Sequence, residues 1–455
     1  MEMRSKLLPA LASRQTYEQG GVMRSTRIWL AAIAALAALA LPSVAHADEV
    51  TKWNAIAQST VLAQPPITSA PPASFTFIAM VQGAVYDAVN SIDQTHRPYL
   101  LTRKFDQLAS QEAAAATAAF RVLTLTFPEQ LANLQPLYDA SLADVPAGPA
   151  KEEGIAAGIA AADAMLAQGH DRRQVLPCVW GTEPGDWRPL LAADGSPLCD
   201  PSAWIAYGLP FLLESPSQFR TDGPHELSSA AYAEEFNEVK ELGALESTTR
   251  TPEQTHTAIF VNSHPAATWN GVARRLADDP SRRLELADTA RLFAMLDLTA
   301  ADAAINCWND KYYWSFWRPI TAIREADRDG NPATEADPNW QPLFVPTLDP
   351  TIAGAGPPLI TPPYPDHPSG LICNSNSSLH ALRAFFGTDK VRFYITSSRF
   401  PGEWRYFDRF SEPISEQIDA RVWAGIHFRT ADVQAAVLGK KVARYMQNHY
   451  FQPID

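Results

Sequence analysis

Apolar residues recur at helical spacing along most of the chain that follows residue 47. Two alanine-rich stretches, 109–127 and 150–167, also have high helix propensity. We expect the longest helix to run over 284–317 and to end at Pro319, because proline cannot continue a helix. Within 75–92 the apolar positions that predict an amphipathic helix are Ile78, Val81, Val85, Val89 and Ile92. Similar patterns predict further helices over 228–243, 369–386 and 411–447.

Strand-like alternation of apolar and polar residues is scarce, so the pattern predicts an all-α fold. The 37 prolines concentrate in the connections between the helical stretches. Two of these connections, 170–227 and 327–368, are long and rich in turn residues, and loops of that length are usually functional or cap a site. We divide the chain into an N-terminal helical region, 48–245, and a C-terminal helical region, 246–455.

The N-terminus has the pattern of a secretory signal peptide. An apolar run over 28–41 follows two arginines and precedes Ala45-His46-Ala47. A basic start, an apolar run of this length and an A-x-A site predict a signal peptide over 1–47. A membrane anchor is the alternative, but the run is shorter than the roughly 20 residues that a span needs. A natural start at Met23 is also compatible with this pattern.

We therefore expect a mature protein that is periplasmic or secreted and has no membrane span. Its apolar content of 46% and charged content of 19% exclude a disordered or fibrous chain. A net charge of −13 without a Lys/Arg block argues against nucleic-acid binding.

Four cysteines are too few for a fold built on disulfides. Export makes single bridges feasible, and Cys178 and Cys199 flank a loop that such a bridge would staple. Cys307 and Cys373 lie in two segments that we expect to converge on one site, although they fit equally well as small buried hydrophobic residues.

Three short segments could together bind an anion. In the first, Lys311 and Arg318 are seven residues apart, so on one helix they would point only about 20° apart. Five aromatic residues between them indicate a half-buried helix, and buried cations need an anion to offset their desolvation. The alternative is an ordinary solvated basic face.

The other two segments have equally plain alternatives. Ser369-Gly370 begins a predicted helix, where free backbone N–H groups and the helix dipole favour an oxyanion, but a serine there is also an ordinary helix cap. Arg421 and His427 would lie on different faces of a straight helix, and Gly425 allows a bend that brings them into one pocket. Taken alone, His427 fits a helix-end histidine that is bonded to a carbonyl.

Taken in order, the patterns K-x6-R-P, P-S-G and R-x5-H resemble the signature shared by vanadium-dependent haloperoxidases and type 2 phosphatidic acid phosphatases. Outside this signature, residues 80–92, 210–219 and 247–255 look like the bacterial branch of haloperoxidase-like proteins. The resemblance covers most of the mature chain. It implies an all-α fold of helical bundles and vanadate as cofactor, with phosphate as a possible substitute.

The resemblance also implies roles for single residues. Lys311, Arg318 and Arg421 would bind the oxygens of vanadate or phosphate, and Ser369-Gly370 would add hydrogen bonds. His427 would bond to the metal atom of vanadate, or attack phosphorus in a phosphatase; with Lys311 it forms the expected catalytic pair. Three cations suit a multiply charged oxyanion, because charge-assisted hydrogen bonds are the strong ones.

One position departs from the family pattern. Where the family has P-S-G-H, this chain has Leu371 in place of the histidine. That histidine is the general acid/base of the family. Such assistance typically contributes 10²–10⁴-fold to the rate, so we expect weakened catalysis. His367 is close in sequence, but it precedes Pro368 and its ring is expected to point elsewhere. An acidic residue four positions after the family's C-terminal histidine can orient that histidine; here the position holds Ala431, with Asp432 one later.

Three functions remain open. The first is an exported vanadate-dependent haloperoxidase-like enzyme that uses hydrogen peroxide to oxidise a halide or a small organic substrate. The second is a soluble acid phosphatase with a phospho-histidine intermediate, and the third is an oxyanion-binding homologue without turnover. We assign no metal site to the remaining histidines with no mutual ligand spacing, namely His96, His170, His225, His256, His264 and His449.

Overall fold

The computed structural model describes residues 48–282 and 284–454, so the predicted signal peptide lies outside the described residues. The described chain is mostly helical and forms one compact unit, which confirms the all-α prediction. The first half contains α2 (Glu49–Leu62), α3 (Pro66–Ser69), α4 (Pro71–Asp93), α5 (Gln111–Thr126), α6 (Leu131–Ala143), α7 (Pro149–Leu166) and α8 (Ala230–Leu242). The second half contains α9 (Pro252–Phe260), α10 (Pro265–Ala277), α11 (Leu286–Trp314), α12 (Pro319–Arg324), α13 (Pro350–Ala353), α14 (Gly370–Phe386), α15 (Pro413–Trp423) and α16 (Arg429–His449).

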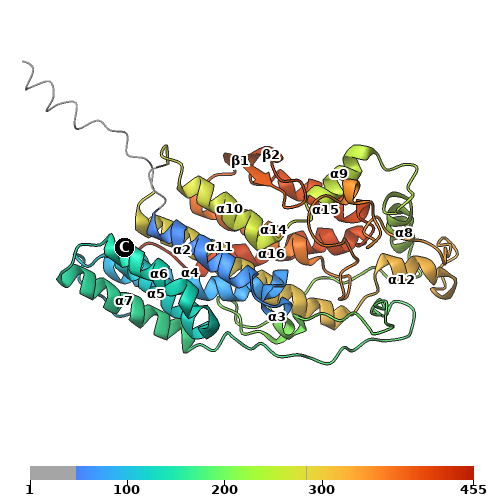
Figure 1. Ribbon diagram of the computed structural model, residues 1–455. Helices are drawn as coiled ribbons and strands as arrows, with labels where there is room; N and C mark the ends of the chain where they lie inside the picture. The colour runs from blue at the N-terminus through green and yellow to red at the C-terminus, as the bar shows by residue number, and fades with distance from the viewer. Residues whose placement is uncertain (1–47, 283, 455) are drawn as a thin grey trace, which may run out of the picture. The chain divides into compact units, whose positions relative to one another are not determined.

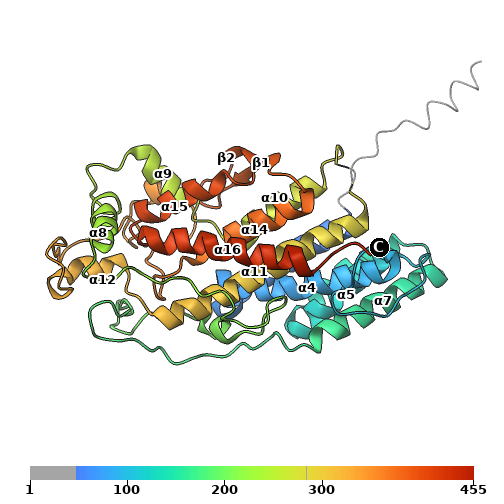
Figure 2. The same cartoon turned by 180° about the vertical axis from the view of Figure 1, so that it is seen from behind.

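Helix α11 is the central element of the fold. It packs along α4 on one side and against α14 and α16 on another, as both views show (Figures 1 and 2). Nearly every residue of α4 is buried, in agreement with its apolar sequence. Helices α5 and α7 pack on each other and on α4 through small residues: a Cβ added to Gly158 would lie 2.6 Å from the backbone oxygen of Ala114. The site described below lies at the C-terminal end of α11.

Two predicted helix boundaries were wrong. Helix α11 ends at Trp314, not at the proline, because Ser315 adopts a left-handed conformation (φ 45°) and caps it. Arg318 is then the N-cap of α12, in extended conformation, as expected for a residue that precedes proline. Lys311 and Arg318 therefore do not share one helical stripe. The predicted helix over 411–447 is divided into α15 and α16.

A small antiparallel hairpin, β1 (Lys390–Thr396) and β2 (Trp404–Arg409), interrupts the helices (Figure 1). In β1 the buried side chains alternate, with Val391, Phe393 and Ile395 facing the core. Short 3₁₀ turns occur at Pro128–Gln130, Ala203–Tyr207 and Ala326–Arg328. Apart from these turns and α13, the two long connections before α8 and α14 are irregular, as predicted.

Two of the four cysteines form a disulfide, and the other two are buried thiols. Cys178 and Cys199 form a disulfide, with a Cα–Cα distance of 5.8 Å, and so staple the loop between them. Cys307 and Cys373 are buried and free. The Cys307 thiol lies 3.7 Å from the carbonyl oxygen of Pro368, so this cysteine does lie close to the predicted site. Within the described ranges, no helix combines the length and apolar character needed to cross a membrane.

Candidate oxyanion site

Lys311 reaches the site from the last turn of α11 and is fully buried. Its ammonium group donates to the carbonyl oxygens of Pro365 (3.1 Å), Asp366 (3.0 Å) and Pro368. Burial lowers the pKa of Lys311 to about 8. An ammonium group has three N–H donors, and all three of Lys311 bond to the segment that leads to α14. It thus fixes this segment and places a positive charge beneath it.

Arg318 lies opposite this segment at the start of α12 and is 2% exposed. Its Nε donates to the carbonyl of Tyr364 (2.8 Å), and its Nη1 donates to the carbonyl of Ile426 (2.7 Å). The buried Nη2 has no hydrogen-bond partner among the residues that the structure describes. A guanidinium nitrogen without an acceptor is costly when buried, so Nη2 is available for an anion.

The N-terminus of α14 provides Ser369 and Gly370. The Ser369 amide donates to the carbonyl of Ala431 (2.9 Å), while its buried hydroxyl has no partner in the described chain. Gly370 cannot be replaced by a larger residue without displacement, because a Cβ there would lie 2.6 Å from the ring of Trp308. The first N–H groups of a helix lack internal acceptors, so this end of α14 favours negative charge.

Arg421 and His427 come from the two sides of the α15–α16 junction. Gly425 lies between them at φ +75°, and a Cβ there would lie 2.7 Å from the side chain of Pro342. The bend expected at this glycine is therefore confirmed. Arg421 Nη1 donates to Asn262 Oδ1 (3.1 Å), and its buried Nε has no partner within the described ranges. Burial lowers the pKa of Arg421 to about 10.

His427 is 2% exposed and contacts two charged groups. Its Nδ1 lies 2.8 Å from Asp366 Oδ1, and Arg318 Nη1 lies 3.3 Å from its Nδ1 and 3.2 Å from its Nε2. Burial and the neighbouring cations lower the pKa of His427 well below its usual value, so the imidazole is neutral. Burial raises the pKa of Asp366 to about 7, against the opposing effect of Arg318 and Lys311.

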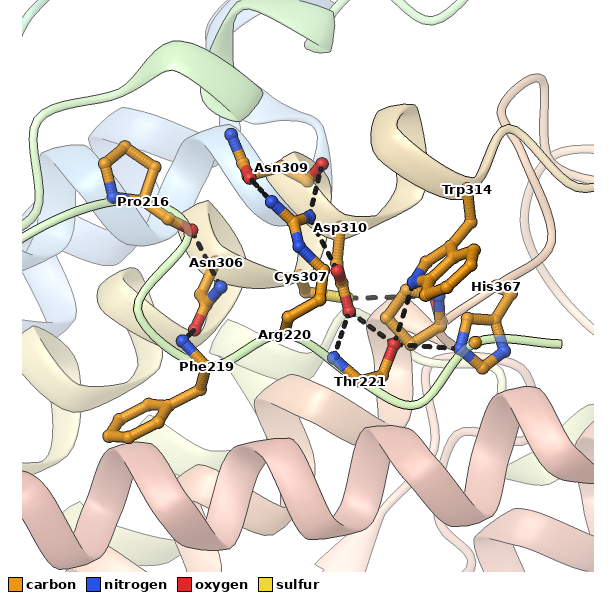
Figure 3. A network of polar contacts seen from close by, with 12 residues as sticks. Pro216, Phe219, Arg220, Thr221, Asn306, Cys307, Asn309, Asp310, Trp314 and His367 are labelled. Atoms are coloured by element: carbon orange, nitrogen blue, oxygen red, sulfur yellow. Dashed lines mark hydrogen bonds and ion pairs between the residues drawn. The ribbon is translucent and has the colours of Figure 1, made fainter.

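A hydrogen-bond network fixes the residue that follows Asp366. On α11, Asp310 forms an ion pair with Arg220 (2.7 Å) and accepts from the Thr221 hydroxyl (2.5 Å). That hydroxyl also lies 3.0 Å from His367 Nε2 and accepts from Trp314 Nε1 (3.1 Å), as Figure 3 shows. The ring of His367 is therefore bound to the loop before α8, and burial lowers its pKa to about 3.

All six residues predicted from the sequence lie around this site, but two others take unexpected positions. Leu371 lines a small pocket with Phe260, Trp269 and Ile395. Both carboxylate oxygens of Asp432 are buried without a hydrogen bond in the described chain, so Asp432 does not bond to the histidine that it was considered to orient.

Asp366 is the site residue that the sequence did not single out. The available signal was its position, an acidic residue between two prolines, Pro365 and Pro368, just before the predicted oxyanion-binding serine. No group of three or more His, Cys, Asp or Glu side chains within 48–282 and 284–454 is arranged to hold a metal cation. The donors that are present are cations, a hydroxyl and a helix N-terminus, which suit an oxyanion.

Comparisons with known proteins agree with this chemistry. Residues 291–455 match the family described as the VCPO second helical-bundle domain. A vanadium chloroperoxidase from Curvularia inaequalis is 24% identical over 388 residues, which cover 70% of this chain and 62% of that protein. The chain thus spans less than two thirds of the length of this curated relative.

Two solved bacterial structures share the fold. The structure described as the first bacterial vanadium-dependent iodoperoxidase aligns with a TM-score of 0.70 at 21% identity, covering 89% of this chain and 98% of that one. A holo-type bacterial vanadium-dependent chloroperoxidase aligns with a TM-score of 0.65 at 16% identity, covering 86% and 93% of the two chains. At these identities the likeness concerns the fold.

Proposed function

We propose, because this chain is a relative of the vanadium haloperoxidases, that it binds vanadate and uses hydrogen peroxide to oxidise a halide or a small organic substrate. One observation carries the proposal. Arg318 Nη2, Arg421 Nε and the Ser369 hydroxyl are buried donors without acceptors in the described chain, and they lie near a neutral histidine. Buried donors are normally hydrogen-bonded, so several unpaired donors at one place indicate that a ligand accepts their hydrogen bonds there.

The donor set fits vanadate well. Arg318 and Arg421 would each bind its oxygens, and Ser369 with the N-terminus of α14 would bind from a third direction. Lys311 would act mainly through its charge, because its N–H groups already bond to carbonyl oxygens. His427 would bond to the metal atom of vanadate through its Nε2. When bound, vanadate supplies a Lewis acid that polarises peroxide.

The chain's own residues then act by positioning and by charge. Buried cations oppose the negative charge that develops on oxygen, and they act strongly because they are shielded from solvent. The general acid/base of the family is absent, since Leu371 cannot exchange a proton. We therefore expect a slower turnover than that of a site with histidine at this position.

The test is bromide oxidation by the mature protein with hydrogen peroxide, with and without orthovanadate. We expect bromination only with vanadate in the wild-type protein, and none in His427→Ala. The matched control is Arg275→Gln, an arginine that bonds to the Tyr394 carbonyl outside the site, and it should retain the activity. Release of phosphate from a phosphoester, without any bromination, would instead indicate the acid phosphatase.

We also propose that the protein is exported. The signal-like N-terminal pattern supports this, and so does the Cys178–Cys199 disulfide, because such bonds persist in oxidising compartments. Detection of the chain in the periplasm or medium, with its N-terminus beginning after residue 47, is the expected result. A full-length chain in the cytoplasm would contradict export.

A further inference from the structure

We propose that Asp366 is a positioning residue that fixes the tautomer of His427, so that Nε2 carries the lone pair that would bond to the oxyanion's metal atom. This inference rests on the proposed function of the site. It assigns to a residue before Ser369 the orienting role that the sequence led us to expect after His427.

A neutral imidazole has one N–H donor and one lone pair, so the partners of its nitrogens decide where the proton lies. Nδ1 of His427 is 2.8 Å from Asp366 Oδ1, which as a carboxylate only accepts hydrogen bonds. Arg318 Nη1, which only donates, lies 3.3 Å from Nδ1 and 3.2 Å from Nε2, so this contact does not distinguish the two nitrogens. The carboxylate contact decides: it favours the Nδ1–H tautomer, because in the other tautomer the lone pair of Nδ1 would face the carboxylate.

The backbone of Asp366 is fixed, which limits where its carboxyl group can lie. The Asp366 amide donates to the carbonyl of Phe316 (2.9 Å), and the Asp366 carbonyl accepts from Lys311 (3.0 Å). Its carboxylate also lies 3.6 Å from Arg318 Nη1, and the residue is fully buried. The next side chain, His367, is bound to Thr221. Each neighbour of the carboxyl group is thus fixed, which a group that positions another requires.

Asp366→Asn tests this assignment, because it keeps the size of the side chain and replaces an acceptor by an amide. The amide N–H can donate to Nδ1 and so favour the Nε2–H tautomer, which leaves no lone pair for the metal. Loss of such a supporting partner typically weakens metal binding 10–100-fold. We therefore expect vanadate affinity to fall by this factor, and Asp366→Glu, which restores a carboxylate, to recover part of it.

The experiment measures the tautomer and the affinity separately. The tautomer of His427 is read from the ¹⁵N chemical shifts of histidine-labelled, vanadate-free protein. Vanadate affinity is measured by calorimetry under the same conditions. Asp432→Asn is the matched control: it removes another buried carboxyl close to the site that does not bond to His427, so the tautomer should not change.

The results separate this inference from the proposed function. An Nδ1–H tautomer in the wild type, lost in Asp366→Asn together with affinity, supports the positioning role. Wild-type protein with the Nε2–H tautomer overturns it without any need for a variant that folds. An unchanged tautomer in a folded Asp366→Asn protein overturns it as well. A wild type with the expected tautomer that binds no vanadate contradicts the proposed function and leaves the tautomer assignment intact.

Discussion

Replacement of Arg421 by glutamine should remove vanadate binding without a loss of stability in the vanadate-free protein. Arg421 is 5% exposed, and among the described residues its side chain donates one hydrogen bond, to Asn262. Its Nε has no acceptor in the described chain, and Asp432 is the nearby group that contributes most to holding its charge. Such an arginine costs free energy until an anion binds.

The size of this cost follows from its pKa. A fall from 12.5 to about 10 corresponds to roughly 3 kcal/mol in favour of the neutral form. For a base whose pKa is lowered by folding, this cost is fully present below the folded pKa of about 10 and disappears only as the pH rises through 12.5. At neutral pH the whole cost is therefore present, and glutamine removes it along with the charge.

Thermal unfolding with and without orthovanadate measures both effects. A ligand at 100 times its Kd stabilises a protein by about 2.7 kcal/mol, which raises the midpoint of wild-type unfolding. Arg421→Gln should unfold no earlier than wild type without vanadate and should show no rise with it. The control Arg275→Gln loses a bond to the Tyr394 carbonyl, so its unfolding midpoint without vanadate should fall. Orthovanadate should still raise that midpoint. A full vanadate-induced rise in Arg421→Gln would refute the proposed donor set.

Three further predictions concern other parts of the chain. Folding raises the pKa of buried Asp297 from 3.8 to about 7, so the ionised carboxylate destabilises the protein; this cost is absent near pH 4 and complete above pH 7. Urea titrations should therefore show that Asp297→Asn stabilises the protein by up to about 4 kcal/mol above pH 7 and that the gain disappears toward pH 4. Reduction of the Cys178–Cys199 bridge, which spans 21 residues, should destabilise the protein by about 3 kcal/mol if the loop order is coupled to global unfolding, and Cys178→Ser should remove the response of the unfolding midpoint to reductant. Leu371→His should raise the rate of vanadate-dependent bromide oxidation at least tenfold; no gain in a folded variant would mean that a histidine at 371 does not reach the oxyanion from the Phe260 pocket, which Leu371 lines.

Hydrophobic periodicity over 75–92 and helix propensity over 150–167 predicted α4 and α7 within a few residues. The end of α11 was misplaced because aromatic residues continue past Trp314 and imitate a helical face. Its true end depends on the left-handed conformation of Ser315, which a serine gives no reason to expect.

The site was predictable to the extent that its residues fall in compact motifs. Lys311, Arg318 and Ser369 could be placed together because their spacing resembles a known signature. Asp366 could not, because its bond to His427 joins residues 61 positions apart and depends on how the backbone of one loop is held. Periodicity reports which face of a helix is buried, but it contains no information about such a loop.

The segment around Asp366 has a carboxyl group that contacts His427, but it lacks the family's general acid/base at position 371. We expect the first to affect vanadate binding and the second to affect the rate of oxidation. Asp366 contacts His427, and Arg318 Nη2 has no acceptor among the described residues, so the groups that we propose to bind vanadate are all present. The general acid/base of the family is absent at Leu371, and general acid–base assistance contributes mainly to the rate. Vanadate affinity and turnover are therefore expected to separate in this protein. Tight vanadate binding with slow bromide oxidation is the combination that this arrangement of residues favours.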